Sequence, residues 1–272
     1  MSSKQKPETG LFSNSMAYAK LGSGARVLLM IPGGPGNTMP TGWALNMTIS
    51  MVRPLLEDGF TIYLVTRKRN MPEGYSVADM AADYAELIRS EFGGKVDLII
   101  GSSYGGMIAQ FIAANHPECF SNIVIQVAAC RVENAERDYA FAKALHEGRT
   151  RAGFAIMMQS LFPKPPMRWF AGIGAWLSAR QFDSTAHDYA RHDVLVEAEA
   201  ELAFDARPIL PKIKGPVLLV NGDQDAYFPM KWVAETAHLI ADCTSIIYPG
   251  KNHMSAAMDK RFLGDVRTFI AR

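Results

Sequence analysis

One serine of this chain lies in a sequence context that could make it a nucleophile. Ser103 is the centre of a G-x-S-x-G pattern at residues 101–105. The residues before it, 96–100, are mainly β-forming apolar residues, and apolar side chains recur at helical spacing from Met107 to Ile112. A strand that turns sharply into a helix strains the central residue and needs small neighbours. The pattern predicts a nucleophile elbow at Ser103; the alternative is an ordinary strand-to-helix turn.

A serine needs a base to remove its proton, and a buried carboxylate improves that base. His253 follows Pro249-Gly250 directly after an expected strand, a position that none of the other five histidines shares. Asp225 follows the preceding strand and competes with Asp223, which could instead cap the turn through its side chain. We favour Asp225 because it reaches further over the strand end. The carboxyl ends of parallel strands lie at one edge of a sheet, so Ser103, Asp225 and His253 are expected to converge there.

A glycine- and proline-rich stretch at residues 32–37 follows the first long core strand. Its bare backbone could approach a ligand and direct N–H groups at an anion, whereas the simpler interpretation is a flexible turn. A tetrahedral oxyanion needs such donors. We therefore expect an oxyanion hole made by the N–H groups of Gly34 and Tyr104.

Strands and helices alternate at short spacing through the first 127 residues and again after residue 215, which predicts an α/β fold with a mostly parallel sheet flanked by helices. Residues 16–21 and 26–31 flank a Gly-Ser-Gly turn and suggest a hairpin. A helix is expected over residues 48–56. Residues 66–75, including Arg67, are expected to form a solvated basic loop. Ser76 and Asp79 resemble a capping box.

Between residues 131 and 205 the pattern is helical, and we expect a cap of four helices inserted over the active site. The α/β core then consists of residues 1–130 and 206–272. Apolar side chains are unusually frequent in the insertion. They could form the insertion's own small core, but methionines and aromatic rings also suit an apolar pocket. The residues expected to line that pocket are Met157, Met158, Phe162, Trp169 and Trp176.

Composition excludes several classes of protein. The net charge of +1 shows no excess of basic residues of the kind that binds nucleic acid. No apolar stretch approaches the ~18 residues needed to cross a bilayer, and the first residues are polar, so we expect no membrane association and a cytoplasmic location. The three cysteines are widely spaced, which favours reduced thiols, and none has metal-ligand spacing.

The patterns at residues 101–105, 222–225 and 250–253 resemble those of the α/β-hydrolase superfamily, and the similarity extends over essentially the whole chain. The loop at residues 32–36 is similar to the HGGPG loop of proline iminopeptidase-like members, with Pro32 in place of histidine. The resemblance implies an α/β-hydrolase fold, a Ser-Asp-His triad, a backbone oxyanion donor at Gly34 and chemistry without a cofactor.

We therefore expect a cofactor-independent serine hydrolase, without a metal, that cleaves an ester or lactone of a small, largely apolar molecule. A first alternative is a proline iminopeptidase-like aminopeptidase or amidase. It would need acidic cap side chains to bind an ammonium group, with Glu133, Glu136, Glu197, Glu199 and Glu201 as candidates. A second alternative is a ligand-binding receptor on a hydrolase fold. The oligomeric state stays open, with a homodimer as one option.

Overall fold

The computed structural model describes residues 6–34, 36–161, 167–185 and 188–272. Its centre is an eight-stranded sheet with the order β1-β2-β4-β3-β5-β6-β7-β8. The six strands β4, β3, β5, β6, β7 and β8 pair in parallel. At one edge of the sheet, β1 pairs antiparallel with β2, and β2 pairs antiparallel with β4. This is the predicted α/β fold with a mostly parallel sheet. The strands are β1 (Glu8–Leu11), β2 (Met16–Leu21), β3 (Arg26–Ile31), β4 (Phe60–Lys68), β5 (Val96–Ser102), β6 (Phe120–Gln126), β7 (Val217–Gly222) and β8 (Cys243–Tyr248).

The hairpin expected from β2 and β3 is wrong, because β4 lies between them. Tyr18 of β2 pairs with Val65 of β4, and Leu28 of β3 pairs with Ile62 of β4. A Cβ at Gly24 would lie 2.0 Å from the carbonyl oxygen of Gly59, so the connection passes tightly beside the start of β4. The apolar strand β3 is thereby placed inside the sheet, with a parallel neighbour on each side.

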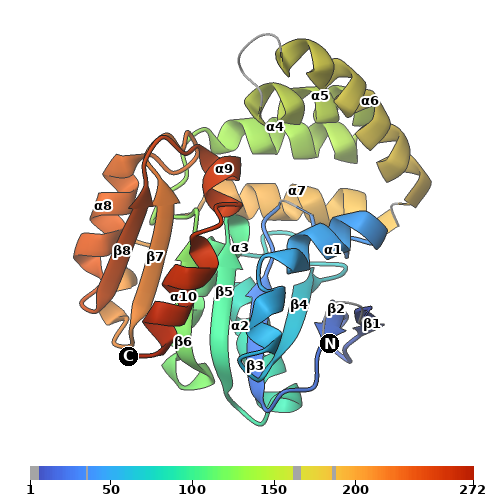
Figure 1. The fold of residues 1–272 in the computed structure, drawn as a ribbon. Coiled ribbons are helices and arrows are strands. Elements are labelled where there is room, and N and C mark those ends of the chain that lie inside the picture. The colour runs from blue at the N-terminus through green and yellow to red at the C-terminus, as the bar shows by residue number, and fades with distance from the viewer. Residues whose placement is uncertain (1–5, 35, 162–166, 186–187) are drawn as a thin grey trace.

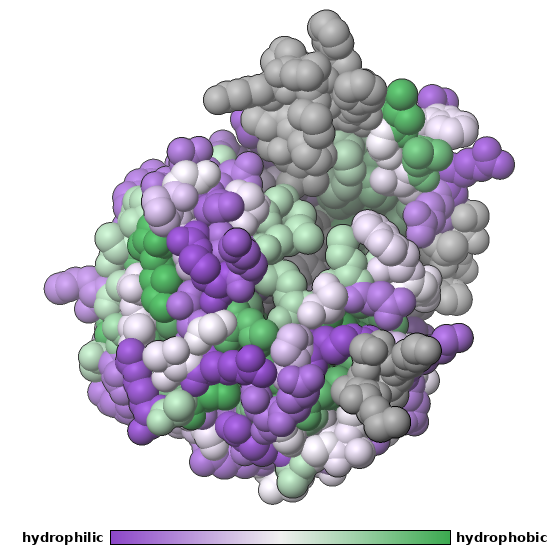
Figure 2. Space-filling view, viewed as in Figure 1, coloured by the Kyte–Doolittle hydropathy of each residue, from purple (hydrophilic) through white to green (hydrophobic). Residues whose placement is uncertain are grey.

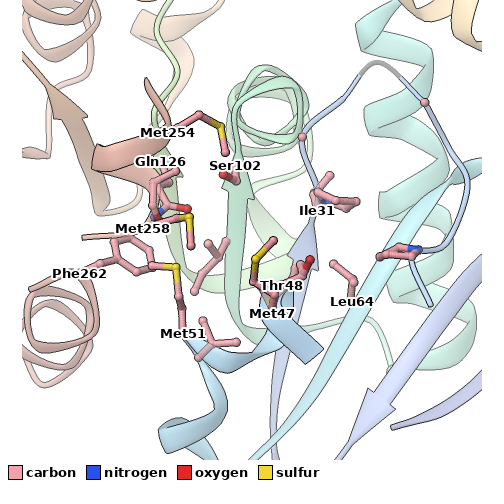
Figure 3. Close-up of a pocket in the computed structure, with 18 of the residues that line it drawn as sticks. Ile31, Met47, Thr48, Met51, Leu64, Ser102, Gln126, Met254, Met258 and Phe262 are labelled. Atoms are coloured by element: carbon pink, nitrogen blue, oxygen red, sulfur yellow. The ribbon is translucent and has the colours of Figure 1, made fainter. Parts of the chain in front are cut away.

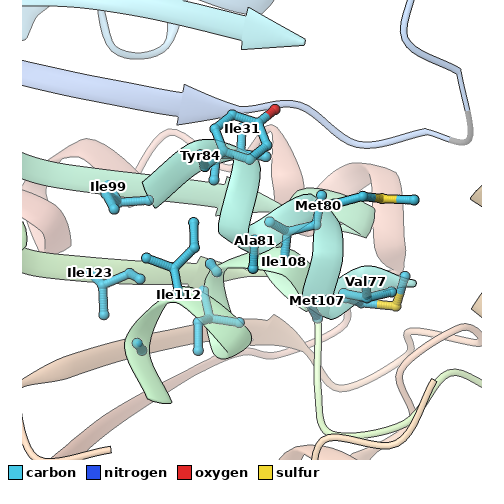
Figure 4. Close-up of a cluster of buried hydrophobic side chains, with 14 of the residues drawn as sticks. Ile31, Val77, Met80, Ala81, Tyr84, Ile99, Met107, Ile108, Ile112 and Ile123 are labelled. Atoms are coloured by element: carbon cyan, nitrogen blue, oxygen red, sulfur yellow. The ribbon is translucent and has the colours of Figure 1, made fainter. Parts of the chain in front are cut away.

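Helices cover both faces of the sheet (Figure 1). α2 (Val77–Glu91), α3 (Tyr104–Asn115) and α8 (Met230–Leu239) pack their apolar residues on one face. α1 (Gly42–Ser50), α9 (His253–Ala257) and α10 (Phe262–Ile270) pack on the other. Figure 4 shows side chains of α2 and α3 interlocked with those of the strands, among them Met80, Ile108 and Ile99. Two buried layers of apolar side chains therefore hold the strand ends that carry the site.

Two local predictions have different outcomes. The capping box at α2 is confirmed, since Ser76 accepts from the Asp79 N–H and the Asp79 carboxylate accepts from the Ser76 N–H. The helix expected over residues 48–56 is wrong in its bounds: α1 ends at Ser50 and a separate 3₁₀ helix covers Arg53–Leu56. Pro54 lacks the N–H that a continuing α-helix requires, so the helix breaks before it.

Among the described residues, four α-helices lie between β6 and β7: α4 (Ala135–His146), α5 (Thr150–Leu161), α6 (Met167–Thr185) and α7 (Asp188–Leu202). We call them the cap. α7 runs across the end of the sheet, and α4, α5 and α6 lie beyond it (Figure 1). A small apolar cluster that includes Phe141, Leu145 and Val194 joins α4 to α7. No helix in the described ranges has the length and apolar character that crossing a membrane requires.

Candidate active site

The turn between β5 and α3 has the geometry of a nucleophile elbow. Ser103 has φ 54° and ψ −117°, a conformation that costs free energy for a residue with a side chain. A Cβ at Gly101 would lie 2.3 Å from the carbonyl oxygen of Gly105, and a Cβ at Gly105 would lie 2.1 Å from that of Ile31. Both positions therefore require glycine, because backbone occupies the space of a side chain.

Ser103, His253 and Asp225 form a continuous chain of hydrogen bonds. His253 Nε2 lies 3.0 Å from Ser103 Oγ, and His253 Nδ1 lies 2.7 Å from Asp225 Oδ2. The Asp225 side chain is fully buried, and its Oδ1 accepts from the N–H groups of Tyr227 and Phe228. The carboxylate is thus fixed in the orientation that holds the imidazole with Nε2 toward Ser103.

Asp223, the competing carboxylate, has another partner. Its Oδ1 accepts from the Gly250 N–H at 2.7 Å, which ties the loop after β7 to the loop after β8. The structure therefore brings Asp225, and not Asp223, to His253.

The two expected oxyanion donors lie beside the nucleophile. Gly34 and Ser103 line the same cavity, and a Cβ at Gly33 would lie 3.2 Å from Ser103 Cβ. Tyr104 follows Ser103 as the first residue of α3. Among the described residues, neither the Gly34 N–H nor the Tyr104 N–H has a hydrogen-bond acceptor, so both are available to an anion.

Two carboxylic acids of the cap also line this cavity of about 320 Å³, Asp138 from α4 and Glu201 from α7. Burial raises the pKa of Asp138 to about 6, although positive charge on His253 acts in the opposite direction. Burial, together with the charge of Asp138, holds the pKa of Glu201 well above its usual range. Within the described part of the chain, Glu201 Oε2 is buried without a hydrogen-bond partner. Asp138 was not among the sequence candidates, since nothing in its local pattern separates it from a solvent-facing helix residue.

A second cavity of about 400 Å³ adjoins the first, and the two share Gly33, Ser102, Met254 and Ala257. Thioether and other apolar side chains surround it (Figure 3). On the surface, apolar residues gather around a hollow between the core and the cap (Figure 2). Sequence reasoning missed this cavity because its walls come from helices and strands far apart in the chain. Its methionines are Met30, Met47, Met51, Met254 and Met258.

The five cap residues expected to line the pocket have different positions. Met157 lines the cavity beside Ser103. Met158 faces Gly174 of α6, and Trp176 is 41% exposed beside Arg180, so these two placements do not support a pocket role. Phe162 and the side chain of Trp169 lie outside what the structure describes.

The five glutamates that were candidates for binding an ammonium group also differ in their surroundings. Glu201 lines the cavity, whereas Glu197 pairs with Arg67 inside the protein. Glu133 pairs with Lys231 and accepts from Trp232 Nε1, and Glu136 and Glu199 are exposed.

Residues 28–263 match the model of the alpha/beta hydrolase family. The chain belongs to this family. It is 28% identical over 193 residues to a putative carbamate hydrolase, RutD, of Stutzerimonas stutzeri, covering 70% of this chain and 71% of the relative. It is 28% identical over 151 residues to 3-oxoadipate enol-lactonase 2 of Acinetobacter baylyi, covering 54% and 51%. The crystal structure of the enol-lactonase from Burkholderia xenovorans LB400 has the same fold, with a TM-score of 0.73 at 16% identity over 97% of this chain and all of that one.

Proposed function

We propose that this alpha/beta hydrolase is a serine hydrolase that cleaves the carboxylic ester or lactone of a small, largely apolar molecule. The observation that carries the proposal is the hydrogen-bonded chain from Ser103 through His253 to the buried Asp225. Names of relatives agree with it: they include an enol-lactonase and a pimeloyl-[acyl-carrier protein] methyl ester esterase.

In the proposed mechanism, His253 Nε2 takes the proton of Ser103 as Oγ attacks the substrate carbonyl. The N–H groups of Gly34 and Tyr104 stabilise the oxyanion of the tetrahedral intermediate. His253 then donates its proton to the leaving alkoxide, and an acyl-enzyme remains on Ser103. A water molecule, deprotonated by His253, releases the acid by the reverse steps.

The methionine-lined cavity supports an apolar substrate. It adjoins Ser103 through Ser102 and Gly33, so an apolar acyl or alkyl group could enter it while the carbonyl reaches Ser103. Flexible thioethers adapt to apolar ligands of different shape.

The test is intact-protein mass spectrometry after exposure to a small fluorophosphonate, combined with hydrolysis of p-nitrophenyl butyrate. We expect one adduct on Ser103 of the wild type and none on Ser103→Ala or His253→Ala. Ester turnover is expected to fall by about 10⁴-fold or more in Ser103→Ala. Undiminished turnover by Ser103→Ala would contradict the mechanism.

Asp138 and Glu201 favour a second candidate, an aminopeptidase or amidase whose substrate carries an ammonium group. Two carboxyl groups line the cavity of Ser103, and the unpartnered Glu201 Oε2 could accept a hydrogen bond from an ammonium group, whose positive charge would favour ionisation of both carboxyls. The test compares prolyl p-nitroanilide with its neutral N-acetyl form. Preference for the cationic form, lost in Glu201→Gln, would support this candidate; equal or no turnover of the two would reject it.

A further inference from the structure

Arg67 is the second-last residue of β4 and was expected on a solvated loop, but that expectation is wrong. The Arg67 side chain is 1% exposed, and its partner Glu197 on α7 is fully buried. Arg67 Nε lies 2.9 Å from Glu197 Oε1, and Nη2 lies 3.0 Å from Oε2, so the pair is bidentate. Burial alone lowers the pKa of Arg67, but Glu197 outweighs it and holds this pKa above its ordinary value, so Arg67 stays charged.

The same guanidinium holds the loop that carries Gly34. Arg67 Nη1 donates to the Pro32 carbonyl at 2.7 Å, and Nη2 donates to the Gly36 carbonyl at 2.6 Å. Glu197 Oε2 accepts from the Gly36 N–H. A Cβ at Gly34 would lie 2.5 Å from Arg67 Nη2, so the loop lies directly against the guanidinium. Glycine and proline have no polar side chains, so the ion pair contacts the backbone of Pro32 and Gly36 directly.

The ion pair also contacts the residue that carries the other expected oxyanion donor. The Tyr104 hydroxyl donates to the backbone carbonyl of Glu197 at 2.8 Å. The Arg67 guanidinium carbon lies 5.1 Å from the centre of the Tyr104 ring. The Gly34 loop and Tyr104 are therefore both attached to one buried pair.

Stability alone is a weak explanation for such a pair. Removing two charges from water is costly, and well-packed apolar residues of similar volume often stabilise a protein as well or better. Directional hydrogen bonds to backbone carbonyls, in contrast, cannot be replaced by apolar contacts.

We propose that Arg67 and Glu197 are positioning residues that align the Gly34 and Tyr104 N–H groups toward the oxyanion. Because Glu197 belongs to α7, a helix of the cap thereby becomes part of the support of the oxyanion hole. The inference rests on the proposed function, since it assigns a role in the same serine mechanism.

The test uses Arg67→Met, Glu197→Gln and the double variant Arg67→Met/Glu197→Met, which leaves no unpaired buried charge. Lys68→Met is the matched control, because Lys68 is the next residue of β4 and its side chain pairs with Asp83 instead. Each variant is first compared with the wild type by circular dichroism and thermal unfolding. Steady-state hydrolysis of p-nitrophenyl butyrate and inhibition by an aryl trifluoromethyl ketone, which forms a tetrahedral adduct on serine, are then measured below the melting temperature.

We expect kcat to fall by about 10²–10³-fold in the Arg67 and Glu197 variants, with KM changed by less than about threefold, as for loss of an oxyanion donor. The inhibition constant of the ketone should rise in parallel, and Lys68→Met should behave as the wild type. A folded double variant with wild-type kcat, or one in which KM alone rises, would overturn the inference. If Ser103→Ala also kept its activity, the proposed function itself would fail, so the two failures are distinguishable.

Discussion

At the scale of single residues, Asp223 and Asp225 are only two positions apart in the sequence but have different surroundings. Asp225 is buried against His253, whereas Asp223 accepts from the Gly250 N–H near the surface. The immediate partners of each carboxylate, and not its sequence position alone, decide what it can do.

Substitution of each aspartate by asparagine should therefore separate catalysis from turn stability. We expect Asp225→Asn to lower kcat by about 10⁴-fold, because the amide no longer holds the imidazole in the required tautomer. Asp223→Asn should leave kcat within about tenfold and lower the melting temperature slightly, since one loop hydrogen bond weakens. Steady-state kinetics measures kcat and thermal unfolding measures the melting temperature of each variant. Equal kinetic losses would contradict the assignment.

Asp138 should make the stability of the protein depend on pH. Its pKa is raised from 3.8 in the unfolded chain to about 6 in the folded protein. The folded state thus holds the proton more tightly, so this stabilisation is present below pH 3.8 and is lost as the pH rises to about 6. The loss is about 3 kcal/mol of unfolding free energy.

The measurement is urea unfolding of the wild type and Asp138→Asn between pH 4 and pH 7.5. We expect the variant to lose less stability over this interval, because the asparagine amide does not ionise. Identical pH dependence in the two proteins would show that Asp138 is not the responsible group.

At the scale of helices and strands, the turn between β5 and α3 is the feature that positions Ser103. β5 and α3 approach so closely at Ser103 that Gly101 and Gly105 contact backbone. Gly264 is a useful contrast, because it lies exposed in α10 and a Cβ at this position would have no neighbour within 4 Å among the described residues outside its own helix turn.

Gly105→Ala is accordingly expected to lower the unfolding free energy by about 3 kcal/mol, because the new methyl group meets the Ile31 carbonyl. Gly264→Ala should raise it by about 0.5–1 kcal/mol, since alanine restricts the unfolded chain. Denaturant unfolding of both variants tests the comparison. A Gly105→Ala protein as stable as the wild type would argue against the tight elbow.

For the whole molecule, the important feature is how α7 joins the cap to the core. Glu197 pairs with Arg67, and Asp193 accepts from the Asn37 side chain and from the N–H groups of Asn70 and Met71. We propose the division into a core, residues 1–130 and 206–272, and a cap, residues 131–205, with α7 held firmly to the core.

Hydrogen exchange should reveal this attachment. We expect backbone amides of α7 to exchange at least about tenfold more slowly than those of α5, because α7 opens only when its buried polar contacts break. Asp193→Asn should accelerate exchange in α7 while leaving α2 unchanged. Uniform exchange across α4, α5 and α7 would contradict a fixed α7.

Much of the core could be predicted from the sequence because its signals are local. The alternation of apolar strands and helices indicated the fold, and the steric demands of a sharp turn pointed to Ser103. Strand pairing was harder to predict from the sequence. The hairpin expected from β2 and β3 does not form, because β4, which is distant in sequence, lies between them.

The amino-acid sequence by itself determined the elbow at Ser103, the position of His253 after a strand and the glycine loop at Gly34, since each depends on neighbours along the chain. Only the tertiary structure brought Asp138 and Glu201 into the cavity and buried Arg67 against Glu197. These are contacts between the cap and the core. Whether a charged residue faces water or a buried partner depends on how separate helices pack, and no local pattern contains that information.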